Sequence, residues 1–355
     1  MSEELTRERL FTMMAGYKST AVLRAAIELG LFDALASGVA DAADLAARLG
    51  VQERALRPLL ASAAGIGLLS LRDNGYALAP GAAELLVSTA PGYCGGITRV
   101  AASDLEWDAL GQLAATVRRG TPVVDALAPD FPYWVDFATH TTFVTDALAG
   151  TVADALGPFA AGRDRLSVLD VGCGHGVFGC TLAQRYPHAR VYAQDWPGVL
   201  AVAEQHAKRR GVADRVSYLP GDAYTVDLGG RYDVILLANV LFHFPPERAT
   251  QLLHRLAGVL EPDGRLVVAG FTTGDRAPTE EAHAALLGLL MLATTEGGRM
   301  YSTVEYERML ATAGLVHTEV YTRPKLLPRV IVASRSGPTA PAPAAFGGTP
   351  DDVLT

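Results

Sequence analysis

The chain has 355 residues, half of them hydrophobic, so it can bury the cores of about two domains. Its formal net charge is −8, with acidic and basic residues interspersed, which argues against a nucleic acid partner because phosphate contacts require a basic surface. The three cysteines have neither zinc-site spacing nor the arrangement of a disulfide framework. A charged N-terminus without a signal-peptide core, and apolar stretches about half as long as the ~20 residues that span a bilayer, predict a soluble, cytoplasmic protein without a membrane partner.

Residues 1–105 predict a small helical domain that ends in a hairpin. Two helical patterns meet at Gly50, each beginning after acidic or polar residues. The run LLSLRDNGYALAP then predicts two short strands around Asn74-Gly75, a favoured hairpin turn. Helix, helix and hairpin in this order are the outline of a winged helix.

A winged-helix outline fits either a DNA-binding regulatory protein or a scaffold for dimerisation. The predicted second helix, about residues 53–66, carries only Arg54 and Arg57 as cations. Because binding to a phosphate backbone requires more positive charge, the scaffold is the favoured interpretation.

The first helical segment has more apolar positions than one buried stripe needs, including Leu10, Phe11, Met13 and Met14. Surplus apolar surface of this kind predicts a homodimer, unless connector helices of the same chain cover it.

Residues 106–160 predict a helical connector. One helical pattern ends at Gly120, and Pro122 follows closely. The next helical segment carries side chains that suit either the wall of an acceptor pocket or ordinary helix packing: Trp134, Phe137, His140 and Phe143.

Residues 161–336 alternate between strand-like runs and helical patterns. The runs are LSVLDVG, ARVYAQD, RVSYLPGD, YDVILLANV, GRLVVAGF, VHTEVY and RVIVASR. Continuous apolar strands separated by helices predict a Rossmann-like α/β domain, with a seven-stranded, mostly parallel sheet covered on both faces. Since no helical pattern separates the last two runs, they are expected to pair antiparallel at one edge.

Two features mark the end of this region. Ser302 followed by Glu305 predicts a capping box at the start of the last helix. Residues 337–355, rich in proline, alanine and glycine, predict a disordered tail. No internal repeat is present.

The strongest motif is VLDVGCGHGVFG, residues 168–179. An apolar strand leads into glycines at 172, 174 and 176, and a helix follows. Glycines let the backbone turn tightly and leave no side chain between it and a ligand. Strand, glycine-rich turn and helix are the context that a nucleotide-binding fingerprint requires, although the G-x-G-x-G spacing alone is common.

Two further acids strengthen this motif. Asp195 ends the next strand, where a carboxylate can accept hydrogen bonds from both hydroxyls of a ribose. Gly221-Asp222 ends the third strand. The carboxyl ends of consecutive strands are where doubly wound sheets bind ligands. Taken singly, each of these residues would also fit a helix cap or a turn.

Together, VLDVGCGHG, AQD, GDAY and GRLVVAG resemble the class I S-adenosylmethionine-dependent methyltransferases. MMAGYKSTAVLRAAIELGLFDALASG and DLAARLGVQERALRPLLASAAGIGLLS resemble the N-terminal dimerisation domain of the small-molecule O-methyltransferases. That family includes the plant caffeate type, the acetylserotonin type and bacterial polyketide-tailoring members. EWDALGQLAATVRRGTP and LATTEGGRMYSTVEYERMLATAGL are similar to later segments of the same family. The resemblance covers roughly residues 8–335 and implies a homodimeric enzyme of specialised metabolism, such as antibiotic biosynthesis.

The resemblance also implies the roles of individual residues. His243 occupies the place of the family's catalytic base, and Asn239 faces the methyl donor. The residues expected to bind S-adenosylmethionine are Asp170, Gly172, Gly174, Gly176, Asp195, Trp196, Gly221, Asp222, Ala223 and Asn239. The residues expected to line the acceptor pocket are Trp134, Phe137, His140, Phe143, Phe242, Met291 and Met300.

His243 has three possible roles. It can be the general base, a packed structural histidine, or a metal ligand that would need His140 or His283 as a partner. No metal is expected at this site. Burial by Phe242 and Phe244 is expected to lower the pKa of the imidazole and keep it neutral at pH 7.

Two carboxylates that assist the histidine in this family are missing. Counted along from His243, the first position is Gly270 and the second is Met300. Their loss leaves two alternatives to O-methylation within the same fold: methylation of carbon, and use of the cofactor without methyl transfer. The acceptor is expected to be a small, largely apolar aromatic or polyketide-like metabolite.

Overall fold

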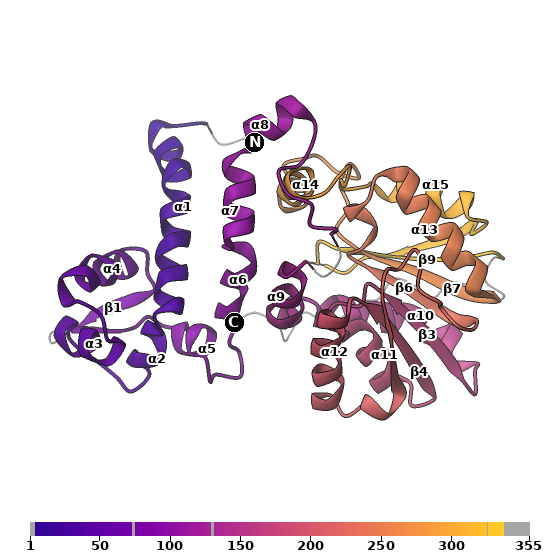
Figure 1. The fold of residues 1–355 in the computed structure, drawn as a ribbon, viewed down its shortest axis with the longest axis horizontal. Coiled ribbons are helices and arrows are strands. Elements are labelled where there is room, and N and C mark those ends of the chain that lie inside the picture. Colours follow the sequence, from indigo (N-terminus) through magenta and orange to yellow (C-terminus); the bar gives the residue numbers. More distant parts are fainter. Residues whose placement is uncertain (1–3, 73–74, 129–130, 325, 337–355) are drawn as a thin grey trace. The chain divides into compact units, whose positions relative to one another are not determined.

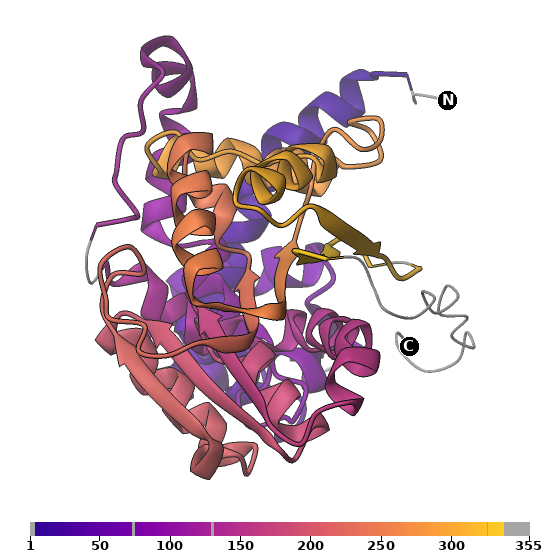
Figure 2. The same ribbon diagram turned by 90° about the vertical axis from the view of Figure 1, so that its right-hand side faces the viewer.

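The computed structural model describes residues 4–72, 75–128, 131–324 and 326–336 (Figures 1 and 2). The chain divides into two compact units, residues 1–107 and 108–355. The predicted tail, 337–355, lies outside the described residues. Within the described ranges, no helix has both the length and the apolar content needed to cross a membrane.

The elements of the first unit are α1 (Arg7–Glu28), α2 (Leu31–Leu35), α3 (Ala42–Leu49), α4 (Glu53–Gly65), β1 (Leu69–Arg72), β2 (Gly75–Leu78), α5 (Ala82–Leu86), η1 (Gly95–Ile97), α6 (Thr98–Ala101) and the start of α7 (Asp104–Gly111).

The first unit contains the predicted winged-helix arrangement in α3, α4, β1 and β2. Asp41 caps α3 by accepting hydrogen bonds from two backbone N–H groups, and Gly50 ends that helix in the left-handed conformation. β1 and β2 pair antiparallel, with Leu69 opposite Leu78. Gly75 is the first residue of β2. Residues 73–74, which join the two strands and include the Asn74 of the predicted turn, lie outside the described residues.

α1 exposes the apolar side chains that the sequence singled out. In the single chain Leu10 is 45 % exposed, Phe11 66 %, Met13 68 % and Met14 53 %. The other end of the helix is packed, with Ala26 fully buried in the core of this unit. Only part of α1 is therefore used to build its own domain.

The elements of the second unit are α8 (Leu113–Arg119), α9 (Tyr133–His140), η2 (Thr142–Val144), α10 (Asp146–Ala161), β3 (Leu166–Val171), α11 (Val177–Arg185), β4 (Ala189–Asp195), α12 (Pro197–Arg209), η3 (Ala213–Arg215), β5 (Val216–Pro220), β6 (Tyr232–Ala238), η4 (Leu241–His243), α13 (Pro246–Val259), β7 (Leu260–Gly270), α14 (Ala282–Thr294), α15 (Thr303–Thr312), β8 (His317–Tyr321) and β9 (Arg329–Ser334).

The second unit is built on a seven-stranded sheet in the order β5-β4-β3-β6-β7-β9-β8. Figure 1 labels β3, β4, β6, β7 and β9 of this sheet. β3 to β7 are parallel, β9 is antiparallel to β7, and β8 pairs antiparallel with β9 at the edge. This confirms the predicted fold class and the antiparallel edge pair. The predicted capping box is also present, since Ser302 and Glu305 satisfy each other's backbone N–H groups at the start of α15.

Helices bury both faces of the sheet. Val168 of β3 packs in a cluster with α10 and α11, whereas Leu169 packs in a second cluster with α13 and α15. Because neighbouring strand residues point to opposite faces and both faces are covered, the central strands have to be apolar throughout.

The segment 106–160 is helical, as predicted, but its last part belongs to the sheet layer. The helical pattern that starts at Tyr133 is interrupted after His140, and α10 begins at Asp146. Leu148, Val152 and Leu156 of α10 are buried against the sheet. Although α10 precedes the expected domain start at residue 161, it therefore packs as part of that domain.

Candidate active site

The candidate site lies where the parallel strands β3, β4, β5 and β6 end. In a parallel sheet the carboxyl ends of all strands meet at one edge, so residues that are distant in sequence become neighbours there. The residues expected to bind the cofactor follow these strands: Gly172, Gly174, Gly176, Asp195, Trp196, Gly221, Asp222, Ala223 and Asn239.

The loop between β3 and α11 needs its glycines for conformation and for space. Gly172, Gly174 and Gly176 have φ angles of 60°, 54° and 70°, a region that side chains disfavour. A Cβ atom on Gly172 would also lie 2.8 Å from Cγ2 of Val240. The loop can therefore turn sharply over the ends of the strands.

Asp195 holds this loop from the end of β4. Its Oδ2 accepts a hydrogen bond from the Gly174 N–H at 2.8 Å, and its Oδ1 accepts one from the Trp196 N–H at 2.7 Å. Burial raises the pKa of this carboxyl to about 6, while these two backbone bonds oppose the rise. Each oxygen has a further lone pair, so the carboxylate can still accept hydrogen bonds from ligand hydroxyls.

Gln194 is a site residue that the sequence reasoning missed. Its Oε1 accepts a hydrogen bond from the Gly172 N–H at 3.3 Å, and its Nε2 donates one to the Gly221 carbonyl at 2.5 Å. A single buried side chain thus joins the ends of β3, β4 and β5. The only sequence signal is an amide directly before the acid that ends the strand.

Asp170 and Asp222 bind backbone groups. Asp170 is buried within β3 and accepts a hydrogen bond from the Gly179 N–H at 3.0 Å. Its pKa rises to about 7 because of burial, an effect that the Gly179 bond partly offsets. Asp222 accepts a hydrogen bond from the Tyr224 N–H at 2.9 Å. Asp170 therefore stabilises the start of α11, and Asp222 stabilises the turn after β5.

His243 lies in η4, the short turn after β6, and aromatic rings enclose its imidazole. The ring of Trp134 meets it edge-on at 5.1 Å, and the ring of Phe242 lies at 4.7 Å. Burial lowers the pKa of His243 to about 4, and the nearby Asn239 backbone partly offsets this effect. The Nδ1 atom is buried and has no hydrogen-bond partner within the described chain.

The second ring beside His243 differs from the sequence expectation. Phe244 was expected to bury the imidazole, but it packs edge-on against Tyr224 at 5.3 Å. The ring of Trp134 lies beside His243 instead. The indole N–H of Trp134 donates to the Ala126 carbonyl at 2.6 Å, which helps to hold the ring there. The Ala126 N–H in turn donates to the Thr294 carbonyl at 2.8 Å, which attaches this segment to the end of α14.

Asn239, which follows β6, carries a second buried polar atom near His243. It is the one non-glycine residue in the described ranges with a positive φ, 56°, and its Oδ1 is buried without a hydrogen-bond partner. Backbone conformations of this kind cost free energy and concentrate at functional sites. A Cβ atom on Gly270, at the end of β7, would lie only 2.7 Å from this oxygen.

The structure brings some of the expected acceptor residues together and leaves others apart. Trp134 and Phe137 pack edge-on at 5.8 Å. Met291, Met300 and Phe242 share one buried cluster. The Arg299 N–H donates to the Phe242 carbonyl at 2.9 Å, so the GGRMYS segment lies against η4.

The other two expected acceptor residues are His140, the last residue of α9, and Phe143, in η2. Nε2 of His140 lies 4.0 Å from Asp136 Oδ1 on the same helix, and Phe143 is 46 % exposed. The ring of His283, the other candidate partner for a metal, lies 5.0 Å from that of Phe271. Across the described parts of the chain, no group of three or more His, Cys, Asp or Glu side chains could hold a metal ion.

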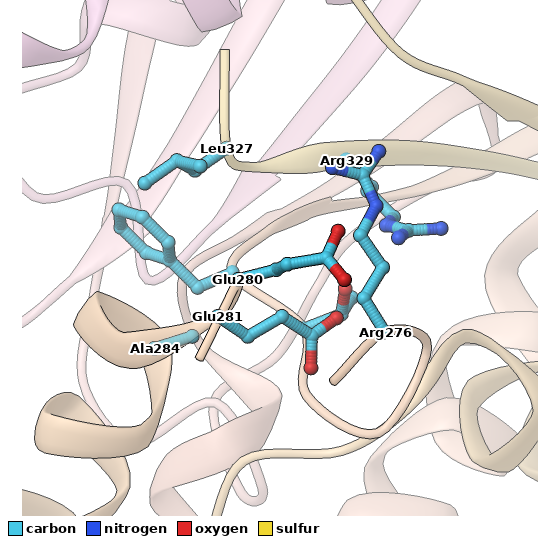
Figure 3. A pocket seen from close by; sticks show the side chains of 8 residues that line it. Arg276, Glu280, Glu281, Ala284, Leu327 and Arg329 are labelled. Atoms are coloured by element: carbon cyan, nitrogen blue, oxygen red, sulfur yellow. The ribbon is translucent and has the colours of Figure 1, made fainter. Parts of the chain in front are cut away.

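A separate cavity lies where β7 ends and β9 begins, lined by Phe271, Thr272 and Arg329 among others (Figure 3). Figure 3 shows Leu327 and Ala284 on one side of it and the charged side chains of Glu280, Glu281 and Arg276 on the other. None of the residues that line it was predicted as a site residue. Oε2 of Glu281 accepts a hydrogen bond from the Gly274 N–H at 2.7 Å.

Comparison with known proteins agrees with this geometry. A family model described as the O-methyltransferase domain matches residues 144–316, and one described as the O-methyltransferase dimerisation domain matches residues 11–88. The 3-hydroxy-5-methyl-1-naphthoate 3-O-methyltransferase of Streptomyces sahachiroi is 31 % identical over 317 residues, which cover 86 % of this chain and 88 % of that one. The acetylserotonin O-methyltransferase of Mus musculus is 31 % identical and covers 92 % of this chain and 88 % of its own.

One relative has a different named activity. The L-tyrosine C(3)-methyltransferase of Streptomyces lavendulae is 26 % identical and covers 87 % of each chain. Among solved structures, PigF with SAH (S-adenosylhomocysteine) superimposes with a TM-score of 0.79 at 25 % identity, covering 93 % of this chain and all of that one. The chain therefore belongs to the S-adenosylmethionine-dependent O-methyltransferase family that carries an N-terminal dimerisation domain.

Proposed function

We propose that this enzyme methylates a hydroxyl group on a small aromatic, polyketide-type metabolite, with His243 as the general base. The proposal rests on the buried Nδ1 of His243, which lies between the rings of Trp134 and Phe242 and has no hydrogen-bond partner among the described residues. A buried polar atom without a partner calls for an explanation, and an acceptor hydroxyl that donates to it supplies one.

The cofactor would be held at the ends of β3, β4 and β5. The loop between β3 and α11, residues 172–176 (the glycine loop), would leave its backbone open to the ligand because its glycines carry no side chains. The remaining lone pairs of the Asp195 carboxylate suit the hydroxyls of a ribose. Trp196, Gly221, Asp222 and Ala223 would complete the adenosine side. When bound, S-adenosylmethionine supplies an already activated methyl group, so the protein's main contribution is alignment of the acceptor with it.

His243 would accept the proton of the acceptor hydroxyl at Nδ1. With a pKa lowered to about 4, the imidazole is neutral at physiological pH, as a base must be, but it is a weak one. It is therefore suited to an acidic hydroxyl, such as a phenol on an electron-poor ring. Trp134, Phe137 and Phe242 offer apolar faces and edges against which such a ring can pack.

The relatives support an acceptor of this class. One is named for a hydroxynaphthoate and one for acetylserotonin, both aromatic compounds. The test is incubation with methyl-labelled S-adenosylmethionine and a panel of hydroxynaphthoates, followed by NMR to locate the label. We expect label on oxygen, and we expect His243→Phe to lower the rate about 10²- to 10⁴-fold.

The matched control for this test is His254→Phe, because His254 is exposed on α13. It should retain the activity of the unchanged enzyme. Full activity in His243→Phe would remove the general-base assignment. Label found only on carbon, or product formed without label, would replace O-methylation.

Methylation of carbon is the second candidate. It is favoured by the missing carboxylates, since Gly270 and Met300 stand where family members place them, and by the relative named as a C(3)-methyltransferase of L-tyrosine. A carbon nucleophile depends less on a strong base at a hydroxyl. The same labelling experiment separates the two.

We further propose that the enzyme is a homodimer. The dimerisation-domain model covers residues 11–88, and α1 carries the exposed side chains of Phe11, Met13 and Met14 within that range. Large apolar side chains grouped on one helix indicate a protein–protein interface.

A further inference from the structure

The glycine loop contains one histidine, His175, and its side chain is buried. It lies between Gly174 and Gly176 and is only 4 % exposed. Its Nδ1 accepts a hydrogen bond from the Val177 N–H at 3.1 Å, and its Nε2 lies 3.3 Å from Oγ1 of Thr145, just before α10. Val177 begins α11, and the first N–H groups of a helix have no partner within the helix. From the position before the N-cap residue, Gly176, His175 therefore satisfies the first of these N–H groups in α11.

A second histidine holds the backbone of the same residue. Nδ1 of His206, on α12, lies 2.9 Å from the His175 carbonyl oxygen. Nε of Arg210 donates to Nε2 of His206 at 3.0 Å, and Arg210 forms an ion pair with Asp146 of α10. The loop is thus attached to both α10 and α12 through two imidazoles.

The partners assign the protons on both rings. A carbonyl can only accept and Arg210 can only donate, so His206 carries its proton on Nδ1 and a lone pair on Nε2. The Val177 N–H can only donate, so His175 is unprotonated at Nδ1 and donates from Nε2 to Thr145. Oγ1 of Thr145 is free to accept because its own proton goes to the Thr142 carbonyl at 2.7 Å.

The charges around the two rings agree with neutral imidazoles. Burial, with the neighbouring His206, lowers the pKa of His175 to about 3. The pKa of His206 is also lowered, first by burial and then by Arg210 and Arg209, against the His175 backbone bond and Asp146, which raise it. Neither ring is placed to exchange protons with an acceptor at neutral pH.

We propose that His175 and His206 are positioning residues that hold the glycine loop in its cofactor-binding conformation. Gln194 and Asp195 bind the loop's N–H groups at Gly172 and Gly174 from the strand side. His206 binds its carbonyl at His175 from the helix side. Because glycines allow many backbone conformations, a loop rich in them loses more entropy on binding unless such bonds order it beforehand.

This inference rests on the proposed assignment of the glycine loop to S-adenosylmethionine. Its test is calorimetric titration of S-adenosylhomocysteine into the full-length chain and two variants at His206. His206→Leu removes the donor, and we expect the affinity to fall about tenfold, the value of one net hydrogen bond. His206→Asn keeps an amide N–H close to the position of Nδ1, and we expect the affinity to stay within about threefold of the unchanged chain.

A second pair of variants covers the possibility that His206→Leu does not fold. Thr145→Val removes the oxygen that accepts from His175, whereas Thr145→Ser keeps it. We expect weaker binding in Thr145→Val than in Thr145→Ser, with the thermal stability of all variants measured alongside.

Three results would overturn the inference. The first is unchanged affinity in both His206→Leu and Thr145→Val. The second is an equal loss in His206→Asn and His206→Leu, because that would reflect packing instead of the hydrogen bond. The third, absence of binding by the unchanged chain, would remove the cofactor site itself and so the proposed function as well.

Discussion

The side chain of Asn239 packs against Gly270 so closely that no other residue fits at position 270 without a clash. Gly270 has a φ of 154°, and any side chain there would meet Oδ1 of Asn239, whose own backbone is held at a positive φ. A larger residue at position 270 would therefore require the Asn239 side chain to move.

The pair makes a testable prediction for stability. Gly270→Ala should lower the free energy of unfolding by about 1–3 kcal/mol through overpacking, measured by urea unfolding of the full-length chain at fixed concentration. The matched control is Gly150→Ala in α10, where a new Cβ meets nothing within 4 Å. Gly150→Ala should be neutral or stabilising by up to about 1 kcal/mol.

Adding Asn239→Gly to Gly270→Ala should recover part of the loss, because the clashing side chain is then absent. A Gly270→Ala variant as stable as the unchanged chain would show that the contact is relieved without cost.

His243 makes a second prediction at the residue scale. Burial lowers its pKa to about 4, so the ring should stay neutral as the pH falls from 8 to 5, whereas an ordinary histidine becomes charged near 6.5. An NMR titration of the His243 ring signals, assigned with His243→Asn, measures this directly. If His243 is the base, activity should remain on its plateau down to about pH 5 and decline below it. A midpoint near 6.5 would contradict the buried position.

The capping box of α15 gives a prediction at the scale of an element. Ser302 accepts from the Glu305 N–H, and Glu305 accepts from the Ser302 N–H at 2.8 Å. Ser302→Ala should cost about 1 kcal/mol of stability, whereas Ser302→Asp, which keeps an acceptor, should cost less. Urea unfolding again measures both. Equal stability of Ser302→Ala and the unchanged chain would mean that the cap contributes nothing.

The stability that this capping box contributes should depend on pH. Burial raises the pKa of Glu305, but the hydrogen bonds from Ser302 and Arg299 together outweigh it, so the pKa is lowered. A depressed pKa in the folded chain means that this stabilisation is present above the unfolded value, 4.5, and is lost as the pH falls through the folded value. The cost of Glu305→Gln should therefore shrink at low pH.

The oligomeric state is the prediction for the whole molecule. Light scattering should give a mass of twice the 37.4 kDa of one chain. Phe11→Asp together with Met14→Lys should shift the mass toward a single chain, because charges would replace exposed apolar side chains of α1. Leu71→Asp, on an equally exposed residue of the hairpin, is the control and should leave the mass unchanged. A mass of 37.4 kDa for the unchanged chain would contradict the dimer.

At this whole-molecule scale, local patterns predicted much of the chain. Apolar runs located all seven strands of the large sheet, Gly50 and Gly120 marked helix ends, and Ser302 with Glu305 marked a helix start. These features depend on neighbours within a few residues, or on burial of a whole strand, and both leave a periodic or positional trace in the sequence. The family and its cofactor followed from such local motifs in their order along the chain.

The sequence by itself thus determined the fold class, the glycine loop and the place of His243. Only the tertiary structure decided what surrounds them: Trp134 beside the imidazole instead of Phe244, Gln194 across three strand ends, Asn239 against Gly270, and His206 on the loop carbonyl. These contacts join residues that lie about twenty to more than a hundred positions apart. Because nothing in the local pattern records which distant side chain reaches a given atom, they become visible only once the strands and helices are packed together.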